Sequence, residues 1–563
     1  MNYYYKHLLL LMSGLLLMCA SQGFPPGGPE DRTPPFIVST FPPSDTTNVS
    51  RTVDVTIEFS EPVSPASAEA SIFITPFPGE TVRYNWKRDR RLTISFGDSL
   101  LESRTYIITV GAGTKDRRNN MMEESFTLAF STGDVLDQGR IRGQVYGDNK
   151  EGTQVWLYDL AETPDPNPED QFPLYITQAG VDGSYRLTNI ALSTYRLFAV
   201  LDRDMNTRYN VGFDQLGVAH RDVTLDSMTM SYEPMNFRIT QRDTLLPMVN
   251  SAQAPDNRHV DLRFTEAMRP DSLSDPHNYK ILNDDDSLNI LNAFMDVNNA
   301  AVVHLATEPQ TAETSYRLIV ENALDLNYLP LLADSNWAEF TGSAVADTFK
   351  PSYVTMQPKD SSMFVPLDSP LEFFFSEALQ PETVARHLVV ADTLADTISG
   401  AVSWPDFSHF VFTPDMTYTP ETFYQVTLPV DSVLDLAGNS LADTLFLREF
   451  TSINPDTLSA IAGTLSDADT TATGAFYMRA MYADQDVERI YDVWLEETGR
   501  FEFSDMLPGR YTIDVYRDED GNRRYSYGEA YPFEPAERYY VYPDTIEIRS
   551  RWPSDGEAIL LPE

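Results

Sequence analysis

Three segments of this 563-residue chain carry the same landmarks in the same order, and this repeat constrains the fold more than any other feature. Each segment opens with an Asp followed four residues later by a Pro, and continues with Phe-Ser/Thr-Glu, a Pro, a Tyr and a closing Phe. The intervals from Glu to Tyr are 45, 50 and 47 residues, and those from Tyr to the closing Phe are 24, 24 and 26. Such self-similarity indicates tandem copies of one structural unit. The repeated acids and tyrosines are Glu61, Glu266, Glu377, Tyr106, Tyr316 and Tyr424.

Each copy consists of short runs with alternating apolar and polar residues, such as VDVTIEF at 53–59, bounded by Pro, Gly, Asn and Asp. This pattern predicts antiparallel β-sandwiches. The repeated Tyr is expected to place its ring in the core and its hydroxyl on nearby backbone, as in a tyrosine corner. The repeated Glu follows a strand and precedes a Pro turn, where we expect its carboxylate to accept backbone N–H bonds; a functional role for this Glu is the alternative.

These landmarks resemble the bacterial Ig-like domain found in surface-layer and other envelope proteins, whose pattern runs from Pro-Pro through Phe-Ser-Glu, Thr-Tyr and Asp-x-x-Gly-Asn to a final Phe-x-Thr. The third segment carries DLAGN at 435–439, the first has DRRNN at 116–120, and the second keeps only DLN at 325–327. The resemblance implies an Ig-like sandwich and a cell-envelope setting, and it implies no reaction.

Two further segments follow a different plan, in which IRGQV (141–145) or IAGTL (461–465) is followed by a Gly and, 12 residues later, a Tyr. The Gly and Tyr are Gly183 and Tyr195 in the first segment, and Gly499 and Tyr511 in the second. This plan resembles the carboxypeptidase-regulatory-like or transthyretin-like sandwich, a module used as a stalk or linker. Its name implies no peptidase activity.

The predicted fold class is therefore all-β, with tandem antiparallel β-sandwiches of the Ig-like and prealbumin-like kinds in an elongated chain. The predicted order is a signal peptide at 1–21, a Pro/Gly linker at 22–35, an Ig-like domain at 33–133, a regulatory-like sandwich at 138–242, a divergent Ig-like domain at 243–343, an Ig-like domain at 347–453 and a regulatory-like sandwich at 457–563.

The N-terminus is typical of a secretory signal, because Lys6 and His7 precede an apolar run at 8–18 and a small-residue neck at 19–21. Cys19 is the only cysteine of the chain, and LLMC at 16–19 resembles a bacterial lipobox, with Met18 in place of the usual small residue. The resemblance implies that Cys19 is acylated and anchors an outer-membrane lipoprotein, whose face of that membrane stays open. The alternative is ordinary cleavage after Ser21.

Composition narrows the classes of function. The net charge of −43 makes nucleic acid a poor partner, while 12% aromatic residues favour a folded chain over an acidic tail. The seven histidines are scattered, and no His-Glu-x-x-His, Gly-x-Ser-x-Gly or phosphate-binding Gly loop occurs. We therefore predict no catalytic residue and no enzyme.

The second plan contains a motif that can bind a hard cation, because Asp and Asn alternate at positions 1, 3 and 5 of a loop. The loops lie 19 residues after Gly183 and Gly499, and in the second copy an acid follows at position 12. The alternative is an Asx-rich turn whose side chains bind their own backbone. Calcium is the one cofactor that this pattern suggests, and its candidate ligands are Asp202, Asp204 and Asn206, and Asp518, Asp520, Asn522 and Glu529.

Two functions fit these features. The first is a non-catalytic envelope lipoprotein that acts as a structural, adhesive or binding scaffold, as an elongated monomer whose partners are the membrane, other envelope proteins or glycans. The second is a carbohydrate-binding accessory protein of a polysaccharide-utilisation system, for which the six tryptophans supply candidate stacking residues.

Overall fold

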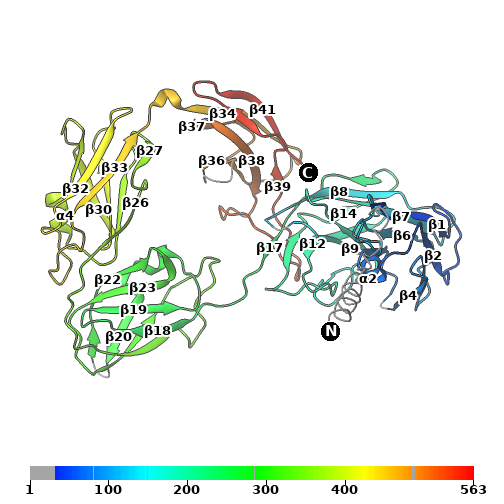
Figure 1. Cartoon of the computed structure of the whole chain (residues 1–563), viewed down its shortest axis with the longest axis horizontal. Coiled ribbons are helices and arrows are strands. Elements are labelled where there is room, and N and C mark those ends of the chain that lie inside the picture. The colour runs from blue at the N-terminus through cyan, green and yellow to red at the C-terminus, as the bar shows by residue number, and fades with distance from the viewer. Residues whose placement is uncertain (1–31, 80, 149, 284–285, 484–488) are drawn as a thin grey trace, which may run out of the picture. The chain divides into compact units, whose positions relative to one another are not determined.

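The computed structural model describes residues 32–79, 81–148, 150–283, 286–483 and 489–563 (Figure 1). The predicted signal peptide, Cys19 and most of the 22–35 linker lie outside these residues. The chain forms two compact parts. The first part holds the residues up to Asn210, together with Asp214–Thr240 and Tyr527–Ala536. The second part holds Val211–Phe213, Gln241–Ser526 and Glu537–Glu563. In the described ranges, no helix combines the length and the apolar character that crossing a bilayer requires.

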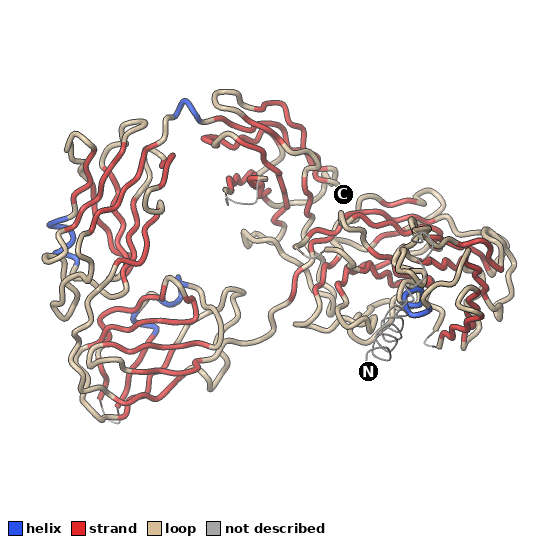
Figure 2. The backbone as a smooth tube through the Cα atoms, in the orientation of Figure 1, coloured by secondary structure: helices blue, strands red, loops and turns tan. Residues whose placement is uncertain are grey.

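The described residues form mainly antiparallel sheets with few helical turns (Figure 2), and parallel pairs occur where β15 (Ser231–Tyr232) and β16 (Phe237–Arg238) join β8 (Gly139–Tyr146), β27 (Ser362–Val365) joins β33 (Phe446–Ser452) and β41 (Ser554–Leu561) joins β34 (Ser459–Asp467). This confirms the predicted all-β fold class. Along the chain the sheets occur as five successive pairs, which we call sandwiches 1 to 5, at residues 37–131, 139–241, 249–341, 353–452 and 459–561. In Figure 1 each pair occupies one continuous stretch of the colour scale.

Sandwich 1 buries the apolar side of its alternating strands between two sheets. Val55, Ile57 and Phe59 point into this core from one strand, while the residues between them are only partly buried. The first sheet has the order β1 (Ile37–Phe41), β2 (Val55–Phe59), β5 (Arg91–Phe96), β4 (Val82–Lys87), and the second β3 (Ile72–Thr75), β6 (Thr105–Val110), β7 (Phe126–Ser131).

Sandwiches 3 and 4 repeat this plan with four strands in each sheet. In sandwich 3 the orders are β18 (Val249–Gln253), β19 (His259–Phe264), β23 (Asn299–Thr307), β22 (Ile290–Asp296) and β21 (Asp286–Leu288), β20 (Tyr279–Asn283), β24 (Ser315–Val320), β25 (Trp337–Thr341). In sandwich 4 they are β26 (Tyr353–Gln357), β28 (Leu371–Phe375), β31 (His409–Pro414), β30 (Gly400–Asp406) and β27 (Ser362–Val365), β33 (Phe446–Ser452), β32 (Phe423–Leu428), β29 (Val389–Asp392).

The Pro that follows each Phe-Ser/Thr-Glu begins a short α-helix, because its fixed φ suits the first helical position and its missing N–H is not needed there. These helices are α2 (Pro65–Glu69), α3 (Pro270–Leu273) and α4 (Pro381–His387), and two 3-10 turns lie at η1 (Pro276–Asn278) and η2 (Pro455–Thr457). The helix leads the chain from one sheet to the other.

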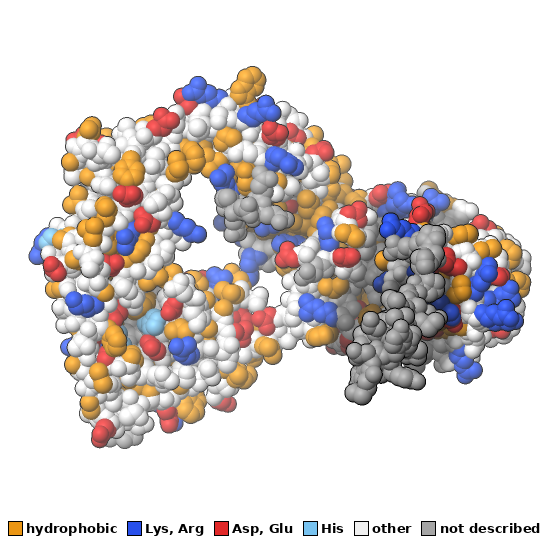
Figure 3. Space-filling view, viewed as in Figure 1, with side chains coloured by type: hydrophobic (Ala, Val, Ile, Leu, Met, Phe, Trp, Pro, Cys, Tyr) orange, Lys and Arg blue, Asp and Glu red, His pale blue; other side chains and the backbone are white. Residues whose placement is uncertain are grey.

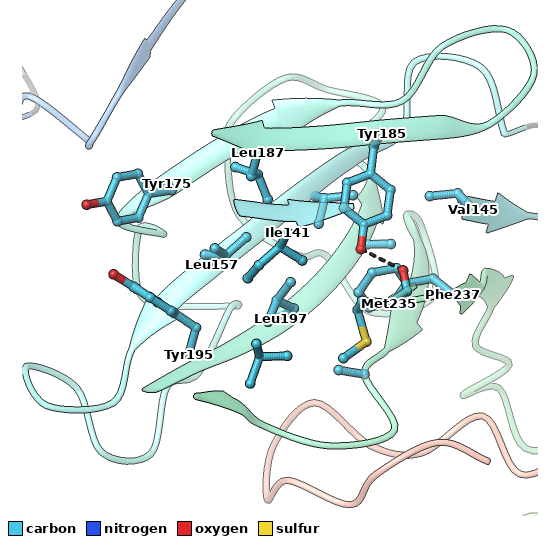
Figure 4. Close-up of a cluster of buried hydrophobic side chains, with 14 of the residues drawn as sticks. Ile141, Val145, Leu157, Tyr175, Tyr185, Leu187, Tyr195, Leu197, Met235 and Phe237 are labelled. Atoms are coloured by element: carbon cyan, nitrogen blue, oxygen red, sulfur yellow. Dashed lines mark hydrogen bonds between the residues drawn. The ribbon is translucent and has the colours of Figure 1, made fainter. Parts of the chain in front are cut away.

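Sandwich 2 packs its core around tyrosines (Figure 4). Tyr175, Tyr185 and Tyr195 are buried there, and the hydroxyl of Tyr185 donates a 2.6 Å hydrogen bond to the carbonyl of Met235. One sheet has the order β10 (Tyr175–Gln178), β9 (Gln154–Asp159), β12 (Thr194–Leu201), β13 (Gln215–Val218), β17 (Thr240–Gln241), with β14 (Val223–Thr224) on β12. The other has β11 (Ser184–Ile190), β8 (Gly139–Tyr146), β15 (Ser231–Tyr232), with β16 (Phe237–Arg238) on β8.

Sandwich 5 shares the second plan. Its sheets have the orders β37 (Gly499–Met506), β34 (Ser459–Asp467), β41 (Ser554–Leu561) and β36 (Ile490–Leu495), β35 (Ala475–Tyr482), β38 (Gly509–Asp518), β39 (Tyr539–Val541), with β40 (Ile546–Ile548) on β38. The glycine that both opening strands share is a point of close backbone approach. A β-carbon would lie 1.7 Å from the Met235 carbonyl oxygen at Gly143, and 2.1 Å from that of Glu557 at Gly463.

Candidate functional site

The repeated tyrosines of the Ig-like segments each hold a strand to the loop that precedes it. The hydroxyl of Tyr106 accepts a hydrogen bond from the N–H of Leu101 at 2.8 Å. Tyr316 and Tyr424 accept the equivalent bonds from the residues five positions upstream, Thr311 and Thr419, at 3.0 and 2.9 Å. All three side chains are buried. This is the geometry of a tyrosine corner, which serves the fold of each sandwich.

The same tyrosines stack on the closing Phe of their segment, which explains why the interval between the two landmarks is nearly constant. Tyr424 and Phe450 are direct cross-strand neighbours on β32 and β33, with ring centroids 5.2 Å apart. Tyr106 pairs with Phe130 in the same register at 5.8 Å, and Tyr316 with Phe340 at 5.3 Å.

The repeated Glu lies in a cluster of carboxylates that was not predicted from the sequence. In sandwich 4 the opening Asp347, the repeated Glu377 and the turn residue Asp435 place carboxylate oxygens within 4.8 Å of one another. In sandwich 3 the residues at the same repeat positions, Asp243, Glu266 and Asp325, form a second such cluster. The shared order of these three landmarks along the chain was the signal that could have predicted both clusters.

The role expected for the repeated Glu needs correction at Glu377, whose Oε2 is buried and has no hydrogen-bond partner. Burial raises the pKa of this carboxyl from 4.5 to about 7; the charge of His259 lowers it, and the charges of Asp347 and Asp435 raise it further. Burial and the charges of Asp243 and Asp325 likewise raise the pKa of Glu266. For Glu61, the cluster's third residue would be Asp31, outside the described residues.

In sandwich 5 the predicted loop brings Asp518 and Asp520 together with Glu537, all three within 4.8 Å. Both oxygens of Asp518 accept loop N–H groups, from Gly521 at 2.8 Å and Asn522 at 3.1 Å on Oδ1 and from Arg523 at 2.9 Å on Oδ2. These bonds are those of an Asx turn. Asn522 contributes its side-chain oxygen to the N–H of Arg524 at 2.7 Å.

Glu537, not the position-12 residue Glu529, is the acid that completes this group. Its two oxygens accept the N–H groups of Glu519 and Ser526 at 2.8 and 2.9 Å, and burial raises its pKa to about 7, with the charges of Asp520 and Asp518 adding to the shift. Glu529 instead pairs through its backbone with Glu534. Glu537 was missed because it follows Asp518 by 19 residues, beyond any loop of calcium-binding spacing.

The loop of sandwich 2 has the same construction. Asp202 and Asp204 lie with the fully buried Asp214, whose oxygens accept the N–H groups of Arg203 at 3.0 Å and Asn210 at 2.8 Å. Asn206 bonds to Asp204 through its side-chain amide at 2.9 Å. Asp214 therefore takes the place that Glu537 takes in sandwich 5. Burial raises the pKa of Asp202.

Each of these loops borders a hollow in the surface. The loop of sandwich 5 and Trp494 line one of about 460 Å³, and the loop of sandwich 2 lines a larger one of about 1000 Å³ shared with β3 of sandwich 1. The hollow of sandwich 5 is thus lined by acidic loop residues and by Trp494, whereas the larger hollow is lined by Asp202 and by the aromatic residues Phe73, Phe77 and Tyr84.

An aromatic row crosses the outer face of sandwich 5. Trp494, Tyr477 and Tyr516 are cross-strand neighbours on β36, β35 and β38, with centroids 4.8 and 5.3 Å apart, and Tyr539 pairs with Tyr516 on β39. Tyr525 packs edge-on against both Tyr516 and Tyr539 at 5.6 Å. Trp494 is partly exposed at the end of this row.

Comparison with known proteins identifies part of the chain. Residues 31–132 and 347–452 match the family described as bacterial Ig-like domain. These are the first and third predicted repeats, and the match confirms the resemblance predicted for them. A search of curated proteins gave no match.

Three solved structures are similar to the chain at very low scores. The N-terminal part of the bacterial S-layer protein SbsC is 12% identical, over 37% of this chain and 44% of that one, with a TM-score of 0.16. Domains 1–6 of SbsC are 9% identical over 92% and 68%, with a TM-score of 0.18. The E. coli alpha-2-macroglobulin is 10% identical over 93% and 43%, with a TM-score of 0.15. The chain spans less than half the length of the first and third of these, and we base no functional inference on them.

The cross-strand Tyr–Phe pairs and the tyrosine corners occur in sandwiches 1, 3 and 4, and the family match coincides with them in sandwiches 1 and 4. Residues 31–132 and 347–452 are therefore similar to the bacterial Ig-like domain.

Proposed function

We propose that this protein is a non-catalytic scaffold of a bacterial cell envelope, held to the outer membrane by a lipid on Cys19 and displaying tandem β-sandwiches to other envelope proteins or glycans. The observation that carries the proposal is the use of the repeated tyrosines: each one ties a strand to its own sandwich, as in Tyr424 with Thr419. The chain thus contains several copies of a self-contained sandwich, and a spacer or a display arm can be built from such copies in series.

The charge of the chain supports an envelope partner and not a nucleic acid. The net charge is −43, and Figure 3 shows basic side chains interspersed with acidic and apolar ones over the visible face. A field of this sign repels phosphate backbones and keeps an exported protein soluble.

Fractionation of cells that express the full chain tests the anchored scaffold. The wild-type chain should label with palmitate and sediment with membranes, whereas Cys19→Ala should remain exported, unlabelled and soluble. Ser21→Ala, which leaves Cys19 in place, is the matched control and should behave as wild type. Equal membrane association of the wild type and Cys19→Ala would refute the anchor. Protease accessibility of the wild-type chain on intact cells is a separate measurement, and it assigns the face of the membrane.

The aromatic row of sandwich 5 favours a second candidate function, carbohydrate binding. Sugar rings stack on aromatic faces, and polar groups beside the ring fix their orientation. Trp494 borders the 460 Å³ hollow together with Asp518, Asp520 and Arg523, so an aromatic surface and polar groups lie in one depression. In this function the protein is an accessory of a polysaccharide-utilisation system.

Retention on immobilised polysaccharides tests this candidate. Trp494→Ala should abolish retention of the full chain on a glycan that binds the wild type. Trp552→Ala is the matched control, because Trp552 belongs to the same sandwich and is 76% exposed, outside the row. Equal retention of all three proteins would exclude the row as a sugar platform.

Calcium at the Asp202 and Asp518 loops belongs to the proposal as a stabiliser of sandwiches 2 and 5. Its support is the convergence of three carboxylates at each loop, two of them on the loop itself and one, Asp214 or Glu537, from outside it. Oxygen ligands of this kind suit a hard cation.

A further inference from the structure

The carboxylate cluster of sandwich 3 has an unsatisfied oxygen at its centre. Asp325 is 1% exposed, and its Oδ1 accepts the N–H groups of Asn327 and Leu329 at 2.8 and 2.7 Å. Its Oδ2 is buried and has no hydrogen-bond partner. A buried carboxylate oxygen without a donor is costly, since burial removes the water that would otherwise solvate it.

The other two Ig-like sandwiches satisfy this oxygen with an amide. In sandwich 4 the side chain of Asn439 donates to Asp435 Oδ2 at 2.9 Å, and in sandwich 1 Asn120 donates to Asp116 Oδ2 at 2.8 Å. The residue at this position of sandwich 3 is Leu329, whose side chain has no donor. Without an amide at this position, Asp325 Oδ2 can be satisfied by a cation.

Two more carboxylates converge on Asp325 at this point. Asp243 and Glu266 place oxygens within 4.8 Å of it and of each other. Asn327 holds Asp243 through a 2.8 Å bond from its side-chain amide to Oδ2. Three ionised carboxylates this close repel one another, and a cation among them would offset that repulsion.

We propose that Asp243, Glu266 and Asp325 form a binding site for a hard divalent cation, Ca²⁺ or Mg²⁺, in sandwich 3. The ligand oxygens come from the segment that opens the sandwich, the end of β19 and the turn after β24, so the cation ties three separate segments together. All three ligands are carboxylates, which favours these two ions over zinc or copper. Remaining coordination positions fall to backbone carbonyls and water.

Calorimetric titration of the metal-free full chain with CaCl₂, and separately with MgCl₂, tests the site. Glu266→Gln should lose one bound ion per chain relative to wild type. Leu329→Asn should weaken the same site at least tenfold while keeping all three carboxylates, because it restores the amide found in the other sandwiches. Asp271→Asn is the matched control: Asp271 lies in the same sandwich and pairs with Arg269 at the surface, and its loss should leave the count unchanged. The arm with the tighter binding identifies the ion.

A second readout separates cation binding from folding. In EDTA, Glu266→Gln should melt no lower than wild type, because removing one of three close negative charges relieves repulsion. With the preferred ion present the order should reverse. An unchanged ion count in Glu266→Gln, together with an unchanged affinity in Leu329→Asn, would overturn the site. A wild-type melting temperature that responds to neither ion would overturn it as well.

Discussion

The rings of Tyr418 and Tyr424 lie 5.1 Å apart in the core of sandwich 4, yet only one of the two hydroxyls has a partner. Tyr424 accepts the N–H of Thr419, whereas the hydroxyl of Tyr418 is buried without a hydrogen bond. Two neighbouring tyrosines with similar burial therefore differ in the state of their hydroxyls, which makes them a useful pair for comparison.

Removing the two hydroxyls should have different effects on the free energy of unfolding. Tyr424→Phe leaves the Thr419 N–H without its acceptor and should lower the free energy of unfolding by about 1–3 kcal/mol. Tyr418→Phe removes a buried group that has no partner and should leave stability unchanged or raise it slightly. Urea unfolding of the full chain, followed by hydrogen exchange of peptides from residues 347–452, measures both. Equal losses in the two variants would contradict the corner's role.

A buried charge network should dominate the stability of sandwich 5. Arg538 donates to Asp467 through two bonds, at 2.5 and 2.8 Å, and Arg517 donates to the same carboxylate. The Arg538 and Asp467 side chains are only 4% and 3% exposed. Asp467→Asn strips two buried guanidinium groups of their counter-charge and should cost about 3–5 kcal/mol.

Hydrogen exchange within residues 457–563 should localise this loss to sandwich 5. The surface pair of Arg500 and Glu502 provides the control, because Glu502→Gln removes an exposed ion pair worth at most about 1 kcal/mol. A comparable cost for both substitutions would show that the buried network adds nothing beyond a surface contact.

Features that recur at similar intervals along the chain could be predicted from the sequence. The number of residues between Tyr424 and Phe450 recurs in the other repeats because the two residues are cross-strand partners. The lengths of the two strands and of the connection between them fix that number. The all-β class followed from alternating runs, since a two-residue period fits only a strand with one buried face.

Features formed by distant segments were not predictable in this way. Glu537 joins Asp518 across 19 residues, so no local motif connects them. The cluster of Asp347, Glu377 and Asp435 spans nearly the whole of sandwich 4, and its carboxylates meet only because the sheets bring the opening segment beside the turn. Each of these acids alone resembles an ordinary turn residue, and only the folded chain distinguishes them.

Sandwich 4 should become more stable at neutral pH when Glu377 is neutralised. The pKa of Glu377 is raised from 4.5 to about 7 by burial, so the unfolded chain releases this proton at lower pH than the folded chain does. Stability is therefore lost as pH rises from about 4.5 to about 7, and the loss is complete above that range. Glu377→Gln removes this cost.

In EDTA, Glu377→Gln should exceed wild type by about 1–2 kcal/mol at pH 8, a value reduced for the exposed part of the side chain. Below pH 4 the two proteins should agree, because both then carry a neutral side chain at this position. Urea midpoints of the full chain between pH 4 and 8 measure the difference. A gap that stays constant over this range would assign the effect to packing instead of charge.

Chelation should distinguish calcium from a self-sufficient turn at the Asp518 loop. Every oxygen of Asp518 already accepts a backbone N–H, so Asp518→Ala would disturb the turn whether or not an ion binds. Asp520 is the better target, because it is exposed and Asp520→Asn keeps an oxygen for the Asn522 N–H that Asp520 Oδ1 accepts at 2.9 Å.

If calcium binds, EDTA should lower the melting temperature of sandwich 5 in the wild type by several degrees, and Asp520→Asn should remove most of that response. Asp555→Asn, an exposed acid of the same sandwich paired with Arg500, should keep it. A wild-type melting curve that is identical with calcium and with EDTA would leave the Asx turn as the whole explanation of the loop, with Glu537 held by the backbone N–H groups of Glu519 and Ser526 alone.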